Sequence, residues 1–452
     1  MKRIGSIMLS LLLAGCGAAS SSAPAQPTTA SGEPSSAPSS SAAAQTPAAP
    51  VTINILAEQN DDPAVQAENV DYINAFNASH PDVQVKAEYM NNDQLRTVIQ
   101  TRLTSGDIDA FEYDSGPGYG GVLAKAGLVA DLSSYYQKYG WPIFDWAKAV
   151  CTYGGVTDCI PENLETLGIF YNKTLFAANG LTVPTDLTTF MQEMDTLKAK
   201  GIIPLAFGDQ PQWPAYHQFS MLMSNIVGND GIWSKIYGDS PWNDANTVKA
   251  IDIFFKQFND KGYFPKSPDA VTYDDANALF FSGKAAMVPT GSWLGASITA
   301  TVGTKFEVGV FPFPSIDGSG IHAPVGIGSG WFISKNSKHA DAAAEFLDWG
   351  LQSDQLKQWG LKVFGTMPAM SFDTTGVDIS PLQTAQLAYL TQASKAGPGV
   401  NIDVLTPANF NDAMSTGFQN VLDGKLTPQQ MADNLQAAYQ TAIKSGTTIQ
   451  KP

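Results

Sequence analysis

The chain has 452 residues and carries 26 basic against 42 acidic side chains, which gives a formal net charge of −16. So acidic a chain lacks the basic face by which nucleic-acid-binding proteins hold phosphates, and we expect no nucleic-acid partner. Arginine occurs only at Arg3, Arg96 and Arg102. Because guanidinium groups are the usual partners of phosphate and dicarboxylate ligands, this scarcity favours a neutral ligand rich in hydroxyl groups.

Residues 1–15 have the pattern of a signal peptide. Two basic side chains precede an apolar stretch that is too short to span a bilayer. The stretch ends in Leu13-Ala14-Gly15-Cys16, which resembles a bacterial lipobox, whose cysteine receives a diacylglyceryl group. We expect Cys16 to anchor the exported protein to the outer face of the bacterial cell membrane, because two acyl chains hold stably. A plain secretory signal with an incidental Cys16 is the alternative.

Residues 16–50 combine the lipid-anchor cysteine with a segment made almost wholly of Ala, Ser, Pro, Thr, Gln and Gly. The segment after Cys16 has a single charge, at Glu33, and no Leu, Ile, Val or aromatic side chain. Such a composition cannot offset the entropy of ordering, so we expect a disordered tether. Roughly 400 residues follow it. That is more than one hydrophobic core usually organises, which predicts two lobes.

From residue 51 the hydrophobic pattern alternates between strands and helices. Strands are expected at 51–57, 83–89 and 108–114, with helices between them that close at His80-Pro81 and Ser105-Gly106. In a second block, strands are expected at 167–171 and 202–207, separated by a helix that opens near Thr185 and ends at Gly201. This alternation predicts an α/β fold with parallel-rich sheets flanked by helices.

Residues 280–293 are expected to position a ligand contact. A helix ends near Phe280, Gly283 makes a turn, a buried strand follows at 285–288, and a tight Thr-Gly-Ser turn then presents Trp293. Ligands bind at the carboxyl ends of strands in open α/β sheets. Further strands are expected at 306–311 and 326–334, and further helices at 340–351 and near the C-terminus.

Cys151 and Cys159 remain once Cys16 is assigned to the lipid. In an oxidising exterior a pair so spaced predicts a disulfide across a turn that contains Gly154-Gly155. Two reduced buried thiols are the alternative. No histidine lies near the pair, and the four histidines of the chain have no ligand spacing among them. We therefore expect neither a metal site nor a cofactor.

Gly116-Pro-Gly-Tyr-Gly-Gly121 matches G-x-G-x-x-G, which taken alone indicates a dinucleotide site. The motif follows the third expected strand rather than the first, Pro117 stiffens its loop, and an exported protein meets no supply of nicotinamide cofactor. We interpret the motif as a flexible loop that leads into a helix. Gly283-Lys284 likewise lacks the first glycine and the Ser/Thr of a P-loop.

Two carboxylate pairs bring a secreted glycoside-active enzyme into consideration. Asp274 and Asp275 are adjacent at an expected helix start, so their side chains diverge. Glu162 and Glu165 would suit a retaining or inverting mechanism if they flank a sugar. The sequence shows no nucleophile elbow and no Cys-His arrangement. We expect a binding protein and no enzymatic activity, with the glycoside-active enzyme as the alternative.

Aromatic, acidic and amide side chains recur in the loops at expected strand ends. They are Glu58, Tyr113, Asp114, Asn163, Trp213, Trp293 and Trp331. Sugars present apolar CH faces that stack on aromatic rings, and hydroxyl groups that hydrogen-bond to carboxylates and amides. We take these residues as candidate carbohydrate contacts. The alternative for each tryptophan is a place in a hydrophobic core.

Segments spread over residues 51–445 resemble, in order, the extracellular solute-binding proteins of ABC importers, family 1, the maltose-binding-like group. LTSGDIDAF, which ends at Phe111, is similar to the family's L-x-S-G-D-x-P-D-V-F, with Ile108 and Ala110 in place of Pro and Val. The likeness continues through GLVADL at 127–132, GIFYNKTLF at 168–176, LKAKGIIP at 197–204, FSGKAAM at 281–287 with GSW at 291–293, and SKNSKH at 334–339.

The resemblance implies a type II periplasmic-binding-protein fold, with two lobes and a ligand cleft at a hinge that the chain crosses more than once. Lobe 1 is expected over 51–160 and 322–372, and lobe 2 over 161–321 and 373–452. The resemblance also implies that a sugar stacks on Trp293. Further contacts are implied from Glu58 and Gln59 after the first strand, from Tyr113 and Asp114 after the third, and more weakly from Trp213 and Trp331.

The function implied is that of a monomeric receptor that captures a carbohydrate, an oligosaccharide in the first instance, and delivers it to the permease subunits of an ABC importer. The family also includes members for glycerol phosphates and other solutes. A non-sugar ligand is therefore a further alternative.

Overall fold

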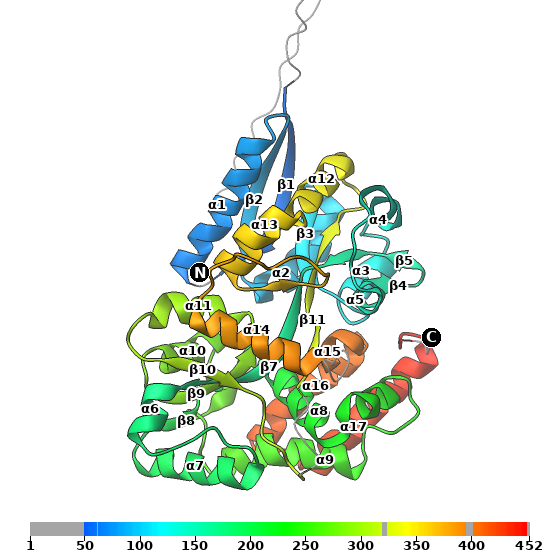
Figure 1. The fold of residues 1–452 in the computed structure, drawn as a ribbon. Coiled ribbons are helices and arrows are strands. Elements are labelled where there is room, and N and C mark those ends of the chain that lie inside the picture. Colours follow the sequence, from blue (N-terminus) through cyan, green and yellow to red (C-terminus); the bar gives the residue numbers. More distant parts are fainter. Residues whose placement is uncertain (1–48, 61, 319–322, 395–400, 450–452) are drawn as a thin grey trace, which may run out of the picture. The chain divides into compact units, whose positions relative to one another are not determined.

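The computed structural model describes residues 49–449, with the exception of 61, 319–322 and 395–400 (Figure 1). The predicted signal peptide, Cys16 and the tether as far as residue 48 lie outside the described residues. Among the helices that the structure describes, none is both long enough and apolar enough to cross a membrane. The rest of the chain forms mixed sheets flanked by helices, which confirms the predicted α/β class.

The first sheet has five strands in the order β2-β1-β3-β12-β6. In that order they span Val83–Met90, Val51–Glu58, Ala110–Asp114, Ser329–Ile333 and Cys159–Pro161. β1 runs parallel to β2 and β3, whereas β12 runs antiparallel to β3 and β6.

Side-chain alternation along β1 gives this sheet two covered faces. Ile53 and Ile55 lie in a core with Phe76 of α1 (Pro63–Ser79) and with residues of α12 (Ala340–Gly350). Leu56 points to the other face, where its core includes Leu95 of α2 (Asn92–Ser105). α1 and α2 end where the sequence predicts, and Gly106 takes the left-handed conformation after α2. Asp62 and Asn91 cap their N-termini.

The second sheet follows the order β10-β7-β9-β8, and β11 and β13 also pair with β7. Its strands span Val308–Phe311, Asn163–Asn172, Ala285–Gly291 and Ile203–Leu205 along that order, then Val325–Ile327 and Met367–Pro368. Ile169 of β7 faces a core with α7 (Leu187–Ala199) and α8 (Trp213–Ile236). Phe170 faces the opposite core with α10 (Tyr273–Phe281) and α11 (Leu294–Val302).

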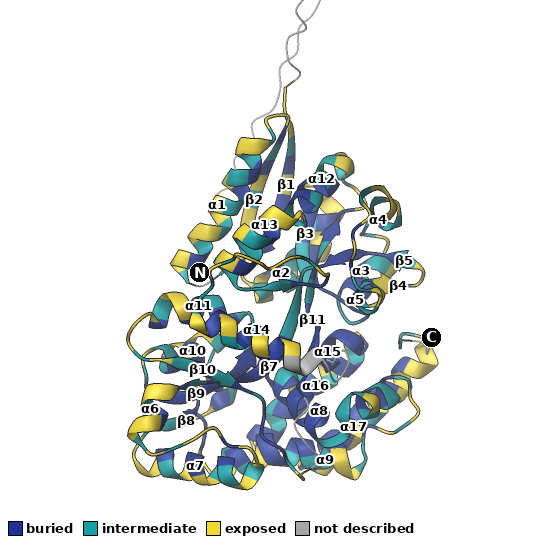
Figure 2. Cartoon of the chain, viewed as in Figure 1, coloured by how far each residue is buried: buried dark blue, intermediate teal, exposed yellow. Residues whose placement is uncertain are grey.

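The remaining elements are mostly helices, and exposed residues occur mainly on helices while the strands are largely buried (Figure 2). They are α3 (Gly120–Lys125), α4 (Ser133–Tyr139), α5 (Asp145–Val150), β4 (Thr152–Tyr153), β5 (Val156–Thr157), α6 (Lys173–Ala178), α9 (Ala245–Ile251), η1 (Asp252–Phe258), η2 (Pro268–Ala270), α13 (Ser353–Gln355), η3 (Leu356–Phe364), α14 (Pro381–Ser394), α15 (Ile402–Leu405), α16 (Ala408–Leu422) and α17 (Pro428–Ser445).

The expectation of parallel-rich sheets is wrong in its emphasis. Within the described second sheet, β8 and β9 form the one parallel pair, and β7 runs antiparallel to β9, β10, β11 and β13. The reason lies in long-range pairing. Strands far apart in the sequence insert beside β7, and the local alternation of strand and helix gives no sign of their direction.

The described strands show three passages of the chain between the two sheets, two of them at neighbouring points and the third between β12 and β13. β6 ends at Pro161 and β7 begins at Asn163, so one passage is Glu162. β11 ends at Ile327 and β12 begins at Ser329, so the other is Gly328. The backbone N–H of Glu162 donates to Ser329 O (3.1 Å), which ties the two passages together. The strand predicted at 326–334 is therefore two strands in two sheets, and the predicted lobe boundaries stay a prediction.

The glycine motif at 116–121 is a packing contact. A Cβ atom added at Gly116 would lie 1.6 Å from the carbonyl oxygen of Val404, and one added at Gly118 would lie 2.7 Å from Thr406 O. The backbone of α15 and of Thr406 after it occupies the space that a bound pyrophosphate would need. The glycines are required because two stretches of main chain meet here, which agrees with rejecting the dinucleotide reading.

We expect Gly116→Ala to lower the free energy of unfolding by about 2–5 kcal/mol, because it combines a left-handed backbone with overpacking. Gly127→Ala is the matched control. Gly127 has a similar φ (+70° against +80°), but a Cβ there meets nothing within 4 Å. The control should therefore lose only about 1–2 kcal/mol. Urea unfolding followed by circular dichroism measures both losses. Equal losses would show that the contact with Val404 contributes nothing.

Candidate functional site

Residues of both sheets line a cavity of about 890 Å³. Seven of the eight predicted ligand contacts line it: Glu58, Gln59, Asp114, Asn163, Trp213, Trp293 and Trp331. The volume falls within the range of about 300–1,000 Å³ that is usual for small-molecule sites. The sequence therefore placed seven residues from distant parts of the chain at one shared cavity.

An aromatic cluster, made by Trp213, His217, Tyr273 and Trp293, contributes to the lining. The ring centroid of Tyr273 lies 4.5 Å from that of Trp213, and the centroid of His217 lies 4.9 Å from that of Trp293. The indole Nε1 of Trp293 donates to the hydroxyl of Tyr273 (3.0 Å). These contacts fix the orientation of the indole ring before any ligand arrives.

Trp293 rests on the main chain of Gly291. A Cβ atom added at Gly291 would lie 1.8 Å from Cζ3 of the indole, so only glycine fits beneath the ring. The predicted tight turn at 290–292 is wrong, because β9 continues to Gly291 and Trp293 directly precedes α11. This packing explains the G-S-W pattern, because the indole ring of Trp293 occupies the space that a side chain at position 291 would need.

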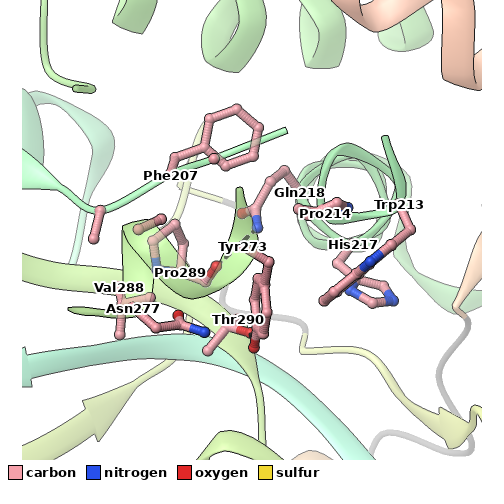
Figure 3. Close-up of a pocket in the computed structure, with 13 residues that line it drawn as sticks. Phe207, Trp213, Pro214, His217, Gln218, Tyr273, Asn277, Val288, Pro289 and Thr290 are labelled. Atoms are coloured by element: carbon pink, nitrogen blue, oxygen red, sulfur yellow. Dashed lines mark hydrogen bonds between the residues drawn. The ribbon is translucent and has the colours of Figure 1, made fainter. Parts of the chain in front are cut away.

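A small pocket of about 10 Å³ adjoins the aromatic cluster, and Figure 3 shows Tyr273 between Trp213 and His217 on one side and Asn277 and Thr290 on the other. Its volume admits about one water molecule and no sugar. The hydroxyl oxygen of Tyr273 lies 2.8 Å from Thr290 Oγ1, within hydrogen-bond distance. Burial lowers the pKa of His217 to about 3, so its imidazole is neutral at physiological pH. The pocket supports the rings and is too small to bind a ligand.

Carboxyl groups from five parts of the chain line the large cavity. They are Glu58 at the end of β1, Glu112 and Asp114 on β3, Glu162 at the passage between sheets, Glu165 on β7, and Asp403 on α15. The backbone N–H of Glu58 donates to Glu112 Oε2 (3.0 Å). Glu112 and Glu162 are hydrogen-bonded to each other, which requires a proton on one of the two carboxyl groups.

Burial, reinforced by mutual repulsion, raises the pKa values of these carboxyl groups. The pKa rises to about 8 for Glu58 and Glu165 and to about 7 for Glu162 and Asp403. The pKa of Glu112 also lies well above its usual range, first through burial and then through the charge of Glu162. Near neutral pH these groups can therefore both donate and accept hydrogen bonds.

Arg96 is the single basic side chain in the described lining of this cavity. Its Nε lies 2.7 Å from Asp114 Oδ2, and its guanidinium lies 5.0 Å from the ring centroid of Tyr119. The neighbouring charge of Asp114 raises the pKa of Arg96 against the effect of burial. The guanidinium is thus already paired, which agrees with the expectation that the ligand is not a phosphate.

Tyr113 is not among the residues that line the cavity. Successive side chains of a strand point to opposite faces. Glu112 and Asp114 face the cavity, and Tyr113 lies on the other face, where its ring centroid is 6.3 Å from those of Phe111 and Tyr119. Tyr113 therefore does not line this cavity, whereas the neighbouring Glu112 does.

The other predicted contacts differ in setting. Trp331 lies in the middle of β12, where it pairs with Glu112 and Ile160, and not in a loop. Asn163 begins β7 and donates from Nδ2 to Glu162 Oε1 (3.1 Å). Gln59 follows β1 with its backbone N–H bonded to Met90 O.

Sequence reasoning missed Glu112, Tyr273, His217, Arg96, Asn401 and Asp403, all of which line the cavity. One signal was available for Glu112, because a carboxylate inside a short apolar strand is unusual. Sequence reasoning considered Glu165 only as a possible catalytic group and not as a ligand contact. Asp403 and Asn401 come from the end of the chain, where no motif marks their return to the first strands.

Cys151 and Cys159 are buried, with Cα atoms 5.0 Å apart and their sulfur atoms in contact. This spacing is within the range of disulfides, so the predicted bond is sterically allowed. Among the described residues, the one group of three potential metal ligands whose atoms converge is Cys151, Asp158 and Cys159. Its two sulfur atoms are directed at each other.

The chain belongs to the family of bacterial extracellular solute-binding proteins, whose match covers residues 59–357. Membership of an extracellular family implies that the protein is exported. It is 28% identical over 298 residues to a multiple sugar-binding protein of Streptococcus mutans, covering 61% of this chain and 66% of that protein. It is 26% identical over 241 residues to the maltodextrin-binding protein MdxE of Bacillus subtilis, covering 51% of this chain and 53% of that protein. These relatives are named as binding proteins and not as enzymes.

Solved structures share the fold. A chitin oligosaccharide binding protein superposes with a TM-score of 0.76 at 22% identity, covering 87% of this chain and all of that one (100%). The maltose/maltodextrin-binding domain MalE from Bdellovibrio bacteriovorus, bound to maltotriose, gives a TM-score of 0.69 at 19% identity, with 87% and 100% covered. The predicted two-domain solute-binding fold is thereby confirmed.

We expect the unliganded protein to lose stability as pH rises from about 5 to about 8. The folded-state pKa values of Glu58 and Glu165 are about 8 against 4.5 in a free chain. In that window the folded state holds more protons than the unfolded state, so the free energy of unfolding falls with rising pH. Glu165→Gln removes one such group and should flatten the decline of melting temperature.

Glu68→Gln is the control for this experiment, because Glu68 is exposed on α1 and does not line the cavity. Its melting temperatures at each pH should follow those of the unmodified protein. A melting temperature that rises over the window, or a decline that is equally steep in both variants, would contradict the assignment of buried protonated carboxyl groups.

Proposed function

We propose that the chain is a lipid-anchored receptor that captures a carbohydrate in the 890 Å³ cavity and delivers it to the permease subunits of an ABC importer. Family membership supports the importer context. The names of several relatives support a sugar ligand, including multiple sugars, maltodextrin and arabinooligosaccharide. We further propose that the receptor acts as a monomer without a cofactor, and that Cys151 and Cys159 are oxidised.

The observation that carries the sugar assignment is the combination of rings and carboxyl groups in one cavity. The indole of Trp293 is held by Gly291 and Tyr273 and offers an apolar surface to the CH face of a sugar. The carboxyl groups of Glu58, Glu162 and Glu165 offer donors and acceptors to its hydroxyl groups. An oligosaccharide needs both kinds of contact, and a glycerol phosphate would need a free cationic group instead.

We propose that the two lobes extend over 51–160 with 322–372 and over 161–321 with 373–452. The passage at Glu162 supports the first boundary, because it joins β6 of the first sheet to β7 of the second. β11 and β13 also pair with β7, so the strands place the later boundaries at Gly328 and before Met367. Binding would then act by favouring the arrangement of lobes in which both contact the sugar.

A glycoside-active enzyme is less well supported. Its two candidate carboxyl groups are held by protein partners: Glu162 accepts from Asn163 and bonds to Glu112, while Glu165 accepts from Asn401. Incubation with oligosaccharides and assay for new reducing ends separates the proposals. Ligand-dependent stabilisation without turnover supports the receptor, and turnover overturns it.

We expect Trp293→Ala to weaken the affinity for the sugar by about 1–3 kcal/mol, the usual loss for one stacked aromatic ring. Titration calorimetry measures the loss for a sugar first found by thermal shift. Trp233→Ala is the control, because Trp233 of α8 stacks on Tyr237 and lines neither pocket. Trp293→Phe should recover part of the affinity. Unchanged affinity in a folded Trp293→Ala protein would remove Trp293 as a sugar platform.

We expect Cys16→Ser to release the exported protein from the membrane into the soluble fraction, because it removes the thioether that holds the acyl chains. Ser20→Ala, in the adjoining tether, should leave the protein with the membrane. Detergent phase partitioning of cell fractions measures both. A Cys16→Ser protein that stays in the detergent phase would contradict lipid anchoring at this residue.

A further inference from the structure

The cavity has a strong excess of acidic side chains. Nine acidic residues line it, against Arg96 as the single basic one among the described lining residues. Arg96 is paired with Asp114, and His217 is neutral because burial lowers its pKa to about 3. Glu58, Glu112, Glu162, Glu165 and Asp403 therefore receive no ion pair from the described lining.

Asp403 provides a second, independent observation. Its side chain is only 3% exposed, it lines the cavity, and its Oδ1 accepts no hydrogen bond from any described residue. Asn401, 2% exposed and also in the lining, has an Oδ1 without a donor as well, while its Nδ2 donates to Glu165 Oε2 (3.3 Å). Buried acceptors of this kind require donors. The place where Asp403, Asn401 and Glu165 meet thus favours a ligand that is rich in N–H groups.

A single metal ion does not fit these carboxyl groups. Calcium needs six to eight oxygen atoms that converge on one point. Among the described residues, the one converging group of three lies at Cys151, Asp158 and Cys159, none of which lines the cavity. The carboxyl groups of the cavity are instead spread along it, an arrangement suited to an extended organic cation.

We infer that the carbohydrate carries at least one primary ammonium group, as a deacetylated amino sugar does, and that this group binds at Asp403 and Glu165. The inference rests on the proposed function and narrows its substrate class. An ammonium group supplies three donors and one positive charge, which match the unsatisfied Oδ1 of Asp403 and the neighbouring carboxyl groups. The sugar rings remain free to stack on the aromatic cluster.

The test compares sugars that differ only at C2. Gluco and galacto mono- and disaccharides are titrated in three forms, with a hydroxyl, an N-acetyl or a free amino group. The pH is neutral, so that Asp403, whose pKa is about 7, is partly ionised while part of the amine is still protonated. At least one amino sugar should bind about 10-fold or more tightly than both of its counterparts, as expected for a hydrogen bond to a charged group. Asp403→Asn should abolish this preference, so that the amino and hydroxyl forms then bind with equal affinity.

Asp275→Asn is the control for the substitution, because Asp275 is exposed on α10 and is not part of the cavity lining. It should keep the preference for the amino sugar. If no amino sugar in the panel binds better than its hydroxyl counterpart, or if Ca²⁺ alone raises the melting temperature and Asp403→Asn removes that effect, the inference is overturned. A neutral sugar that binds would then still support the proposed function. If no saccharide binds in any form, the proposed function fails as well.

Discussion

The site depends on the pairing of four strands at two neighbouring passages between the two sheets. β6 pairs with β12 in the first sheet, and β7 pairs with β11 in the second. The connections at Glu162 and Gly328, which join these strands, are therefore neighbours. The N–H of Ser115 donates to Gly328 O (2.9 Å), which ties the end of β3 to the same point. Carboxyl groups distant in the sequence are brought together because these backbones are fixed.

This placement explains why burial and charge act together in the cavity. Glu165 lies against Gly328, since a Cβ added there would lie 2.3 Å from Glu165 Oε2. Its pKa rises to about 8 first because it is buried and then because Asp114 and Asp403 repel it. Hydrophobic packing would have cost less here than a set of buried acids. Groups held at such a cost, in a cavity of ligand size, favour recognition over stability as their role.

Much of the framework could be predicted from local sequence, because hydrophobic periodicity and caps are local properties. The first strands and helices, from β1 to β3, fall close to their predicted bounds. The face to which a strand side chain points was harder to predict from the sequence. Glu112 lines the cavity and Tyr113 does not, because a shift of one residue along a strand moves a side chain to the opposite face. Strand direction beside β7, and the return of α15 to the cavity, depend on long-range pairing and leave no local pattern.

The glycines near the cavity also depend on contacts that the local sequence does not reveal. Motif reading assigns glycine-rich segments to turns and phosphate loops, yet here the decisive glycines mark close approach. Gly116 admits the backbone of Val404, Gly291 admits the indole of Trp293, and Gly328 admits the carboxylate of Glu165. Two of these contacts join segments that are distant in the sequence, α15 to the loop after β3 and β7 to the passage at Gly328, and the third packs Trp293 against the end of β9. In this chain a glycine near the candidate site therefore indicates close packing by another group. The identity of that group is known only from the folded structure.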